Sequence, residues 1–202
     1  MKTKNRSTLV ICASMALLPS AIFAQARPTH APAALMLQDA TLGQGASAGD
    51  HFSVADKHFI KAAAQGGLAE VKLGQLAADK GGTDAVKDFG NKMVKDHSAL
   101  NDAMKPFADK AGVPVPTELS AKDQALYNRL NGLHGAAFDS AYTSAMVKDH
   151  VMDKADFGKE ANSTRNADLR DAVKQGDQTI TMHLAMARKL SATHCKSDEA
   201  GK

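Results

Sequence analysis

Cysteine and aromatic residues are scarce in this sequence. It has two cysteines and no tryptophan in 202 residues, and aromatic residues make up 4% of the chain. Cys12 lies in an apolar run near the start, and Cys195 lies in a polar segment near the end. If the first segment is removed on export, as argued below, one cysteine remains and no intrachain disulfide can form. We interpret Cys195 as a free thiol, with a disulfide-linked dimer as the alternative.

The motifs of common enzyme classes are absent as well. The sequence has no Gly-x-Ser-x-Gly, no phosphate-binding loop and no Cys–His nucleophile pair. No segment alternates with a period of two, and β-branched residues are sparse, which argues against a β-sheet fold. We therefore leave catalysis undecided and favour a non-catalytic protein.

The N-terminal segment is typical of a secretory signal. Three basic residues precede an apolar run, residues 9–18, that is too short to span a bilayer. Small residues follow, so that cleavage after Ala24 or Ala26 is expected. The pattern predicts a signal peptide over 1–26 and an exported protein, periplasmic or associated with the outer membrane. An uncleaved anchor is the alternative.

Charge excludes one class of partner. The full chain has 25 basic and 22 acidic residues. The predicted signal peptide contains three of the basic residues and no acidic one, so the mature chain holds 22 of each. No run of Lys and Arg with interleaved aromatic residues remains. We expect no nucleic-acid partner and no transmembrane segment in the mature chain, and peripheral association with the envelope stays open.

Glycine, proline and apolar periodicity divide the rest of the chain. Residues 27–51, with two prolines and a Gly-rich stretch, predict a flexible leader, and residues 193–202 predict a polar tail. Between them, residues 52–192 show apolar positions at three- and four-residue steps. Capping residues and breakers predict helices over 53–80, from 83 to the Gly112–Pro116 segment, over 120–131, over 135–162 and over 166–190.

Four long helices in two hairpins follow from these bounds. The short helix at 120–131 falls in the long connection between the hairpins. The predicted fold is therefore all-α, a ferritin-like four-helix bundle with a long crossover that contains a short extra helix.

One pentapeptide occurs twice. Met93-Val94-Lys95-Asp96-His97 recurs as residues 146–150, and an aromatic residue, Phe89 or Tyr142, stands four places before each methionine. That spacing is one helical turn, so each histidine lies on a face that otherwise consists of core residues. The repeat indicates a duplicated helix pair.

Residues 59–190 resemble the bacterial "domain of unknown function 4142" family. The segments that carry the resemblance are AEVKLG at 69–74, MVKDH at 93–97, FDSAY at 138–142, DH at 149–150 and HL at 183–184. The resemblance implies an exported helical bundle of the ferritin-like superfamily, whose members are often labelled outer-membrane proteins. It implies no established activity.

Four ionisable side chains fall on the predicted core faces, one per long helix: Glu70, His97, His150 and His183. Facing helices of a bundle can build a metal site in this way. Three imidazoles with few carboxylates would suit iron, zinc or copper as the bound ion. Three further polar residues stand near them along the helices: Asp139, Tyr142 and Asp153.

Two features argue against a shared site. Counted from each hairpin turn, the two residues of a pair differ in height by about 7 Å, so one ion bound by all four would be strained. The sequence also has no Glu-x-x-His, the pattern of di-iron bundles. Asp96 and Asp149 precede their histidines and are expected to point about 100° away.

Two functions remain open at this stage. The favoured one is a non-catalytic envelope protein that acts by binding or in stress protection, with the imidazoles bonded to Glu70, Tyr142 and Asp139 in a buried structural network. The alternative is a metal-binding, redox-active protein built on the same residues.

Overall fold

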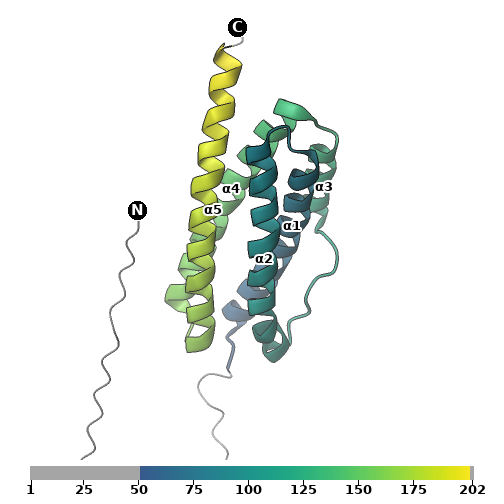
Figure 1. Ribbon diagram of the computed structural model, residues 1–202. Coiled ribbons are helices and arrows are strands. Elements are labelled where there is room, and N and C mark those ends of the chain that lie inside the picture. Colours follow the sequence, from purple (N-terminus) through teal and green to yellow (C-terminus); the bar gives the residue numbers. More distant parts are fainter. Residues whose placement is uncertain (1–50, 201–202) are drawn as a thin grey trace, which may run out of the picture. The chain divides into compact units, whose positions relative to one another are not determined.

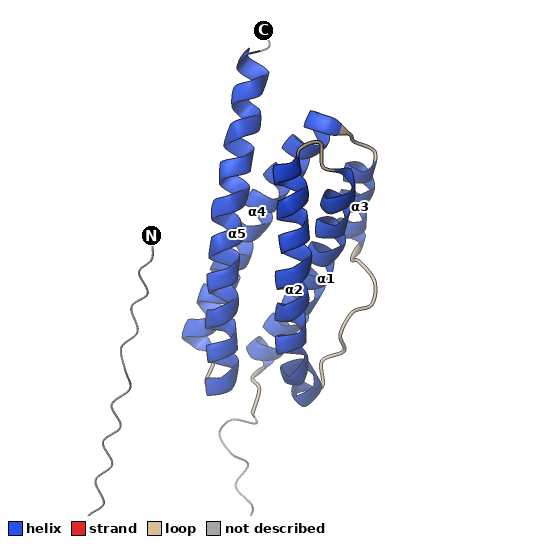
Figure 2. Cartoon of the chain, viewed as in Figure 1, coloured by secondary structure: helices blue, strands red, loops and turns tan. Residues whose placement is uncertain are grey.

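The computed structural model describes residues 51–200, with side chains up to residue 193, and all of them belong to one compact unit. The predicted signal peptide, the leader up to residue 50, and the side chain of Cys195 lie outside the described residues. Five helices form the unit: α1 (Val54–Lys80), α2 (Asp84–Ala111), α3 (Ala121–Asn131), α4 (Gly135–Ser163) and α5 (Ala167–Ala200) (Figures 1 and 2). The prediction of an all-α bundle with a short helix in the crossover is confirmed.

Helix starts follow the local capping chemistry. Ser53 and Asp56 form a reciprocal capping box, Ser120 accepts from the backbone of Asp123, and Asn166 Oδ1 accepts from the N–H of Leu169 at 2.9 Å. These three caps were predicted. Toward its other end, α5 continues as helix to Ala200, through most of the segment predicted as a polar tail.

The turn between α1 and α2 is held by a side chain from α4. Gly81 is not left-handed, since its φ is −49°, and Thr83 makes no side-chain cap. Instead the buried carboxylate of Asp139 accepts from the Gly82 N–H at 2.7 Å and from the Thr83 hydroxyl at 2.9 Å. Glycine is needed at position 82 because a Cβ there would lie 2.7 Å from the backbone of Gly135.

The helices pair as two antiparallel hairpins, α1 with α2 and α4 with α5. The hairpins meet through α2 against α5 and α1 against α4, and α3 packs on α1 and α4. Phe59 near the start of α1 packs on Phe157 near the end of α4, so these two helices are also antiparallel. It follows that α2 and α4, which carry the two pentapeptides, run in the same direction at diagonally opposite corners.

The apolar core is divided into two clusters. One contains Phe89, Phe138 and Tyr142, and the other contains Phe59, Leu169 and Ile180. Along each long helix, the buried Glu or His lies between the residues of one cluster and those of the other. The polar residues therefore form a layer between two apolar halves. No helix in the described part of the chain is both long and apolar enough to cross a membrane.

Glycines bring α1 and α2 close together beside this layer. A Cβ at Gly90 would lie 2.6 Å from the Ala78 nitrogen and 2.7 Å from the Gly74 oxygen, so the two backbones are in contact. Farther along, a Cβ at Gly67 would overlap the side chain of Asn101, so that side chain fills the place of a missing Cβ. The close approach places Glu70, one turn from Gly74, and His97, two turns from Gly90, within side-chain reach.

Candidate metal centre in the bundle core

The structure brings all four predicted residues together. Glu70 comes from α1, His97 from α2, His150 from α4 and His183 from α5, and each is at most 4% exposed. The three imidazole ring centroids lie 5.0–5.6 Å apart. His97 Nδ1 is 2.8 Å from Glu70 Oε2, and His150 Nε2 is 3.6 Å from Glu70 Oε1.

The expected mismatch in height is closed by the direction of the side chains. Every Cα–Cβ bond in a helix tilts toward the N-terminus of that helix. Glu70 therefore leans away from the α1–α2 turn, whereas His97, which is farther from that turn along the chain, leans back toward it. His150 and His183 meet for the same reason in the second hairpin. Helical height therefore does not keep the four side chains apart.

A chain of hydrogen bonds leads from the layer to the surface. His97 Nε2 lies 3.1 Å from His183 Nδ1, and His183 Nε2 lies 2.9 Å from Asp96 Oδ2. Lys92 pairs with the same Asp96 oxygen at 2.8 Å. Burial raises the pKa of Asp96, but the hydrogen bonds from Lys92 and His183 outweigh it and hold this pKa below its usual value. Asp96 was expected to point away from the site. The direction in which it points faces α5, and there its carboxylate contacts His183.

This chain assigns the protons on the two rings. Ionised Asp96 accepts from His183 Nε2, so a neutral His183 accepts at Nδ1, where His97 Nε2 donates. Burial lowers the pKa of His97 to about 4 and lowers that of His183, which keeps both rings neutral. His97 Nδ1 then carries a lone pair that faces a carboxylate oxygen and makes no hydrogen bond. Two acceptors at that distance require a cation between them, either a proton held by Glu70 or a metal ion.

His150 has no hydrogen bond at either ring nitrogen, although it is fully buried. Burial lowers its pKa to about 3 and outweighs the opposing effect of the Met146 carbonyl one turn earlier. Glu70 Oε1 and the Tyr142 hydroxyl are likewise without partners. Each unpaired buried polar group costs about 1–3 kcal/mol, so this layer is poorly satisfied by the protein alone.

Two overlapping groups of residues have ligand atoms within 4.8 Å of one another. One is His97, His150 and His183, and the other is Glu70, Asp149, His150 and Asp153. Around an ion with bonds near 2.1 Å, neighbouring ligand atoms lie roughly 3–4 Å apart, so small side-chain movements would close either group on an ion.

Two acids of the second group, Glu70 and Asp153, favour the protonated form when no other cation is present. Burial, followed by the charge of Asp149, raises the pKa of Glu70 well above its usual value. Burial and the neighbouring Glu70 raise the pKa of Asp153 to about 9, and burial raises that of Asp149. Asp149 was expected to point away from the site, yet its carboxylate belongs to this second group. Asp139, predicted to lie beside the histidines, instead holds the α1–α2 turn.

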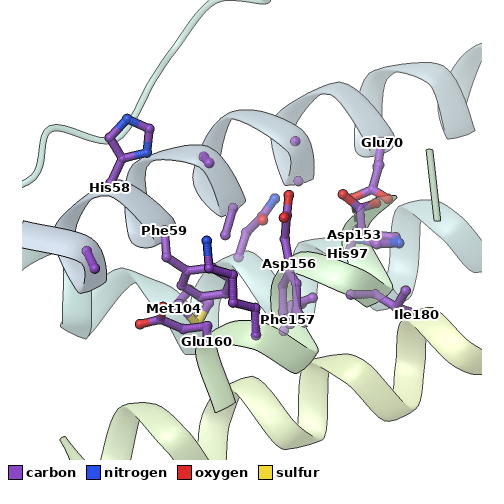
Figure 3. Close-up of a pocket in the computed structure, with 18 of the residues that line it drawn as sticks. His58, Phe59, Glu70, His97, Met104, Asp153, Asp156, Phe157, Glu160 and Ile180 are labelled. Atoms are coloured by element: carbon purple, nitrogen blue, oxygen red, sulfur yellow. Dashed lines mark ion pairs between the residues drawn. The ribbon is translucent and has the colours of Figure 1, made fainter. Parts of the chain in front are cut away.

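A cavity of about 490 Å³ leads to the layer between α1, α2 and α4. Glu70, His97 and Asp153 line its inner end, and Glu160 lies at the other end (Figure 3). Small residues of α1, such as Ala62 and Gly66, leave this space open. An ion or small molecule can therefore reach the layer through the cavity.

Glu160 should make stability depend on pH. Burial and a hydrogen bond to Asp56 raise its pKa to about 7, whereas the pKa of Asp56 is lowered and that residue stays ionised. A raised carboxyl pKa means that the folded state binds the proton more tightly, so this stability is complete below about pH 4.5 and is lost as pH rises through about 7. The full shift is worth about 3 kcal/mol, and water in the cavity should reduce it to about 1 kcal/mol.

The Glu160→Gln variant, which mimics the protonated acid, should lose this dependence and gain about 1 kcal/mol over the wild type at pH 8. Thermal unfolding followed between pH 5 and pH 8 measures it. Glu118→Gln, at an exposed position, serves as the control and should follow the wild type. A Glu160→Gln curve parallel to the wild type would contradict the assignment.

Comparison with known proteins adds a family and a fold. Residues 41–190 match the family described as "Domain of unknown function (DUF4142)". No curated protein matches the chain. Among solved structures, the chain is similar to the crystal structure of a DUF305 fragment from Deinococcus radiodurans, with a TM-score of 0.57 and 11% identity. The match covers 71% of this chain and 97% of that one. At this identity the likeness concerns the fold alone.

Proposed function

We propose that this chain, which belongs to the DUF4142 family, binds a transition-metal ion in the core of its bundle. His97, His150 and His183 supply imidazole ligands and Glu70 supplies a carboxylate. The observation that carries the proposal is the set of buried polar atoms without partners at His150 and Glu70 Oε1, beside a His97 Nδ1 that only a proton or a metal ion can join to Glu70 Oε2. A cation in their midst would satisfy them together.

The ligand set suits certain ions. Neutral imidazoles with a carboxylate favour zinc, copper or iron over magnesium and calcium, which prefer oxygen ligands. The lowered histidine pKa values leave one nitrogen of each ring without a proton at neutral pH, so binding through that nitrogen need not first remove a proton. Glu70 would give up its proton to the incoming ion.

Asp96 has a supporting role in the proposal. By accepting from His183 Nε2 at 2.9 Å, it fixes the ring so that Nδ1 points into the layer. A carboxylate behind a metal-binding histidine orients the ring and increases its basicity. On metal binding, His183 Nδ1 would exchange its contact with His97 for one with the ion.

The competing account, a purely structural network, has less support. It needs hydrogen bonds from the imidazoles to Glu70, Tyr142 and Asp139, and of these Glu70 contacts His97. The Tyr142 hydroxyl has no partner, and Asp139 bonds the α1–α2 turn. A network with several unsatisfied members is less stable than an apolar core of the same shape.

The location of the protein is part of the proposal. The signal-like pattern over residues 1–26 supports export to the periplasm, with association at the outer membrane as the finer alternative. We infer a binding role there rather than catalysis, because the sequence carries no recognised catalytic motif.

Elemental analysis of the mature protein, purified without a His tag or chelator and then loaded with iron, zinc or copper, tests the proposal. We expect about one ion per chain in the wild type, bound through the four named residues. The His97→Ala, His150→Ala double variant should bind at least about 100-fold more weakly while remaining helical by circular dichroism.

A double variant at exposed histidines, His58→Ala with His134→Ala, is the matched control because it removes the same number of imidazoles. It should bind like the wild type. Failure of the wild type to bind any of the three ions, or equal binding by both double variants, would refute the metal centre.

A further inference from the structure

The cavity is larger than an ion needs. Its volume of about 490 Å³ falls in the range of sites for small organic molecules. A water molecule occupies about 30 Å³ of the liquid, so the space exceeds that of a hydrated ion with a few waters. Whatever fills it would contact the cavity wall as well as the polar layer.

The charged groups of the wall are mostly acidic. Four carboxyl groups line the cavity, those of Glu70, Asp153, Asp156 and Glu160, against the single ammonium group of Lys159. An anionic occupant would meet repulsion from this wall, whereas a cationic one would be attracted.

The acids stand at both ends, with apolar side chains between them. Figure 3 shows Glu70 and Asp153 at one end and Glu160 at the other, with Phe157 in between. The wall between the ends is formed by Phe59, Phe157, Leu100, Met104 and Ile180. On α4, Asp153 and Glu160 are two turns apart, which is about 10 Å along the helix.

Three carboxyl oxygens that face this space accept no hydrogen bond from an N–H group: Glu70 Oε1, Asp153 Oδ2 and Glu160 Oε1. Glu70 instead contacts the carboxyl of Asp153, and Glu160 contacts that of Asp56. Glu70 and Glu160 are only 4% and 5% exposed. Buried acceptors of this kind are expected to find donors. Each end of one elongated, apolar-walled space therefore presents two carboxyl groups in contact with each other.

We propose that the cavity binds a linear aliphatic amine with a cationic group at each end. One ammonium group donates to Glu70 and Asp153, the other donates to Glu160, and the methylene chain packs between Phe59 and Phe157. An ammonium group has three N–H donors, which matches the two acceptors at the inner end. The apolar wall excludes a bare ion as the best occupant, and the acids exclude a fatty acid.

Calorimetry with spermidine on chelator-treated protein tests the proposal. The expected result is one binding site per chain. n-Butylamine, which has one ammonium group and a short chain, should bind at least about 10-fold more weakly, because it leaves one acidic end unsatisfied. The Glu160→Gln variant should weaken spermidine binding and leave butylamine binding unchanged.

A pair of glycine variants separates the cavity from the surface. A Cβ at Gly66, which lines the cavity, or at Gly158, which does not, would meet no atom within 4 Å. Gly66→Leu should therefore fold, fill the space and lower spermidine affinity at least about 10-fold, whereas Gly158→Leu should bind like the wild type. No binding by the wild type, or equal binding by both variants, would overturn the proposal. Because metal is absent throughout, either result is independent of the metal centre.

Discussion

Replacement of His150 by leucine should stabilise the metal-free protein by about 1–2 kcal/mol. Both ring nitrogens of His150 are buried without a hydrogen bond, so the imidazole loses its hydration on folding and gains little in return. Leucine has a similar volume and no polar atom to desolvate. Urea unfolding in the presence of a chelator measures the change. The same variant should lose the metal, so that stability and binding move in opposite directions.

The matched control is His183→Leu. His183 is as buried as His150, but it has hydrogen bonds to His97 and Asp96. Its removal would strand both partners and should cost about 2–3 kcal/mol. A purely structural network predicts that both substitutions destabilise. Equal losses in the two variants would therefore contradict our interpretation of the layer.

The Gly90→Ala variant should lose about 3 kcal/mol of stability, or fail to fold. Its new Cβ would lie 2.6 Å from one backbone atom of α1 and 2.7 Å from another. Backbone cannot rotate aside as a flexible side chain can, so α1 and α2 would have to separate. Since Glu70 and His97 lie one to two turns from this contact, metal affinity should decline together with stability.

Gly158→Ala is the control for this loss. Gly158 also lies inside a long helix, but a Cβ there would meet no atom. Alanine is the better helix former, so this variant should gain about 0.5–1 kcal/mol in chemical unfolding. If the two substitutions had the same effect, the contact between the α1 and α2 backbones would not determine the stability of this hairpin.

The parts of the fold that could be predicted depend on local sequence. Ser53, Ser120 and Asn166 cap helices through residues three places away, and such caps are visible in the sequence. Glu70 and His150 could be recognised because each interrupts an otherwise apolar helix face. The four-helix arrangement then followed from the lengths of the helices and of the connections.

The parts that could not be predicted depend on what lies across an interface. Asp96 seemed to face solvent because a single helix has one core face, yet in a bundle the flank of α2 also meets α5. Asp139 was assigned to the wrong neighbours because its partners, Gly82 and Thr83, are 57 and 56 residues away in the chain. The cavity exists because small side chains leave space unfilled between α1 and α4. Apolar periodicity shows which face of a helix is buried, but it does not show how completely the space beside that face is filled.

The parallel course of α2 and α4 bears on the origin of the repeated pentapeptide. One copy lies on the second helix of the first hairpin, and the other lies on the first helix of the second hairpin. Tandem duplication of a helical hairpin would instead place the second copy on α5. The repeat therefore does not record the duplication of a helix pair in this gene. Its two copies lie at corners of the bundle that are related by a pseudo-twofold axis parallel to the helices. Both copies therefore occupy equivalent positions around the core, although duplication of a hairpin would not relate those positions to each other.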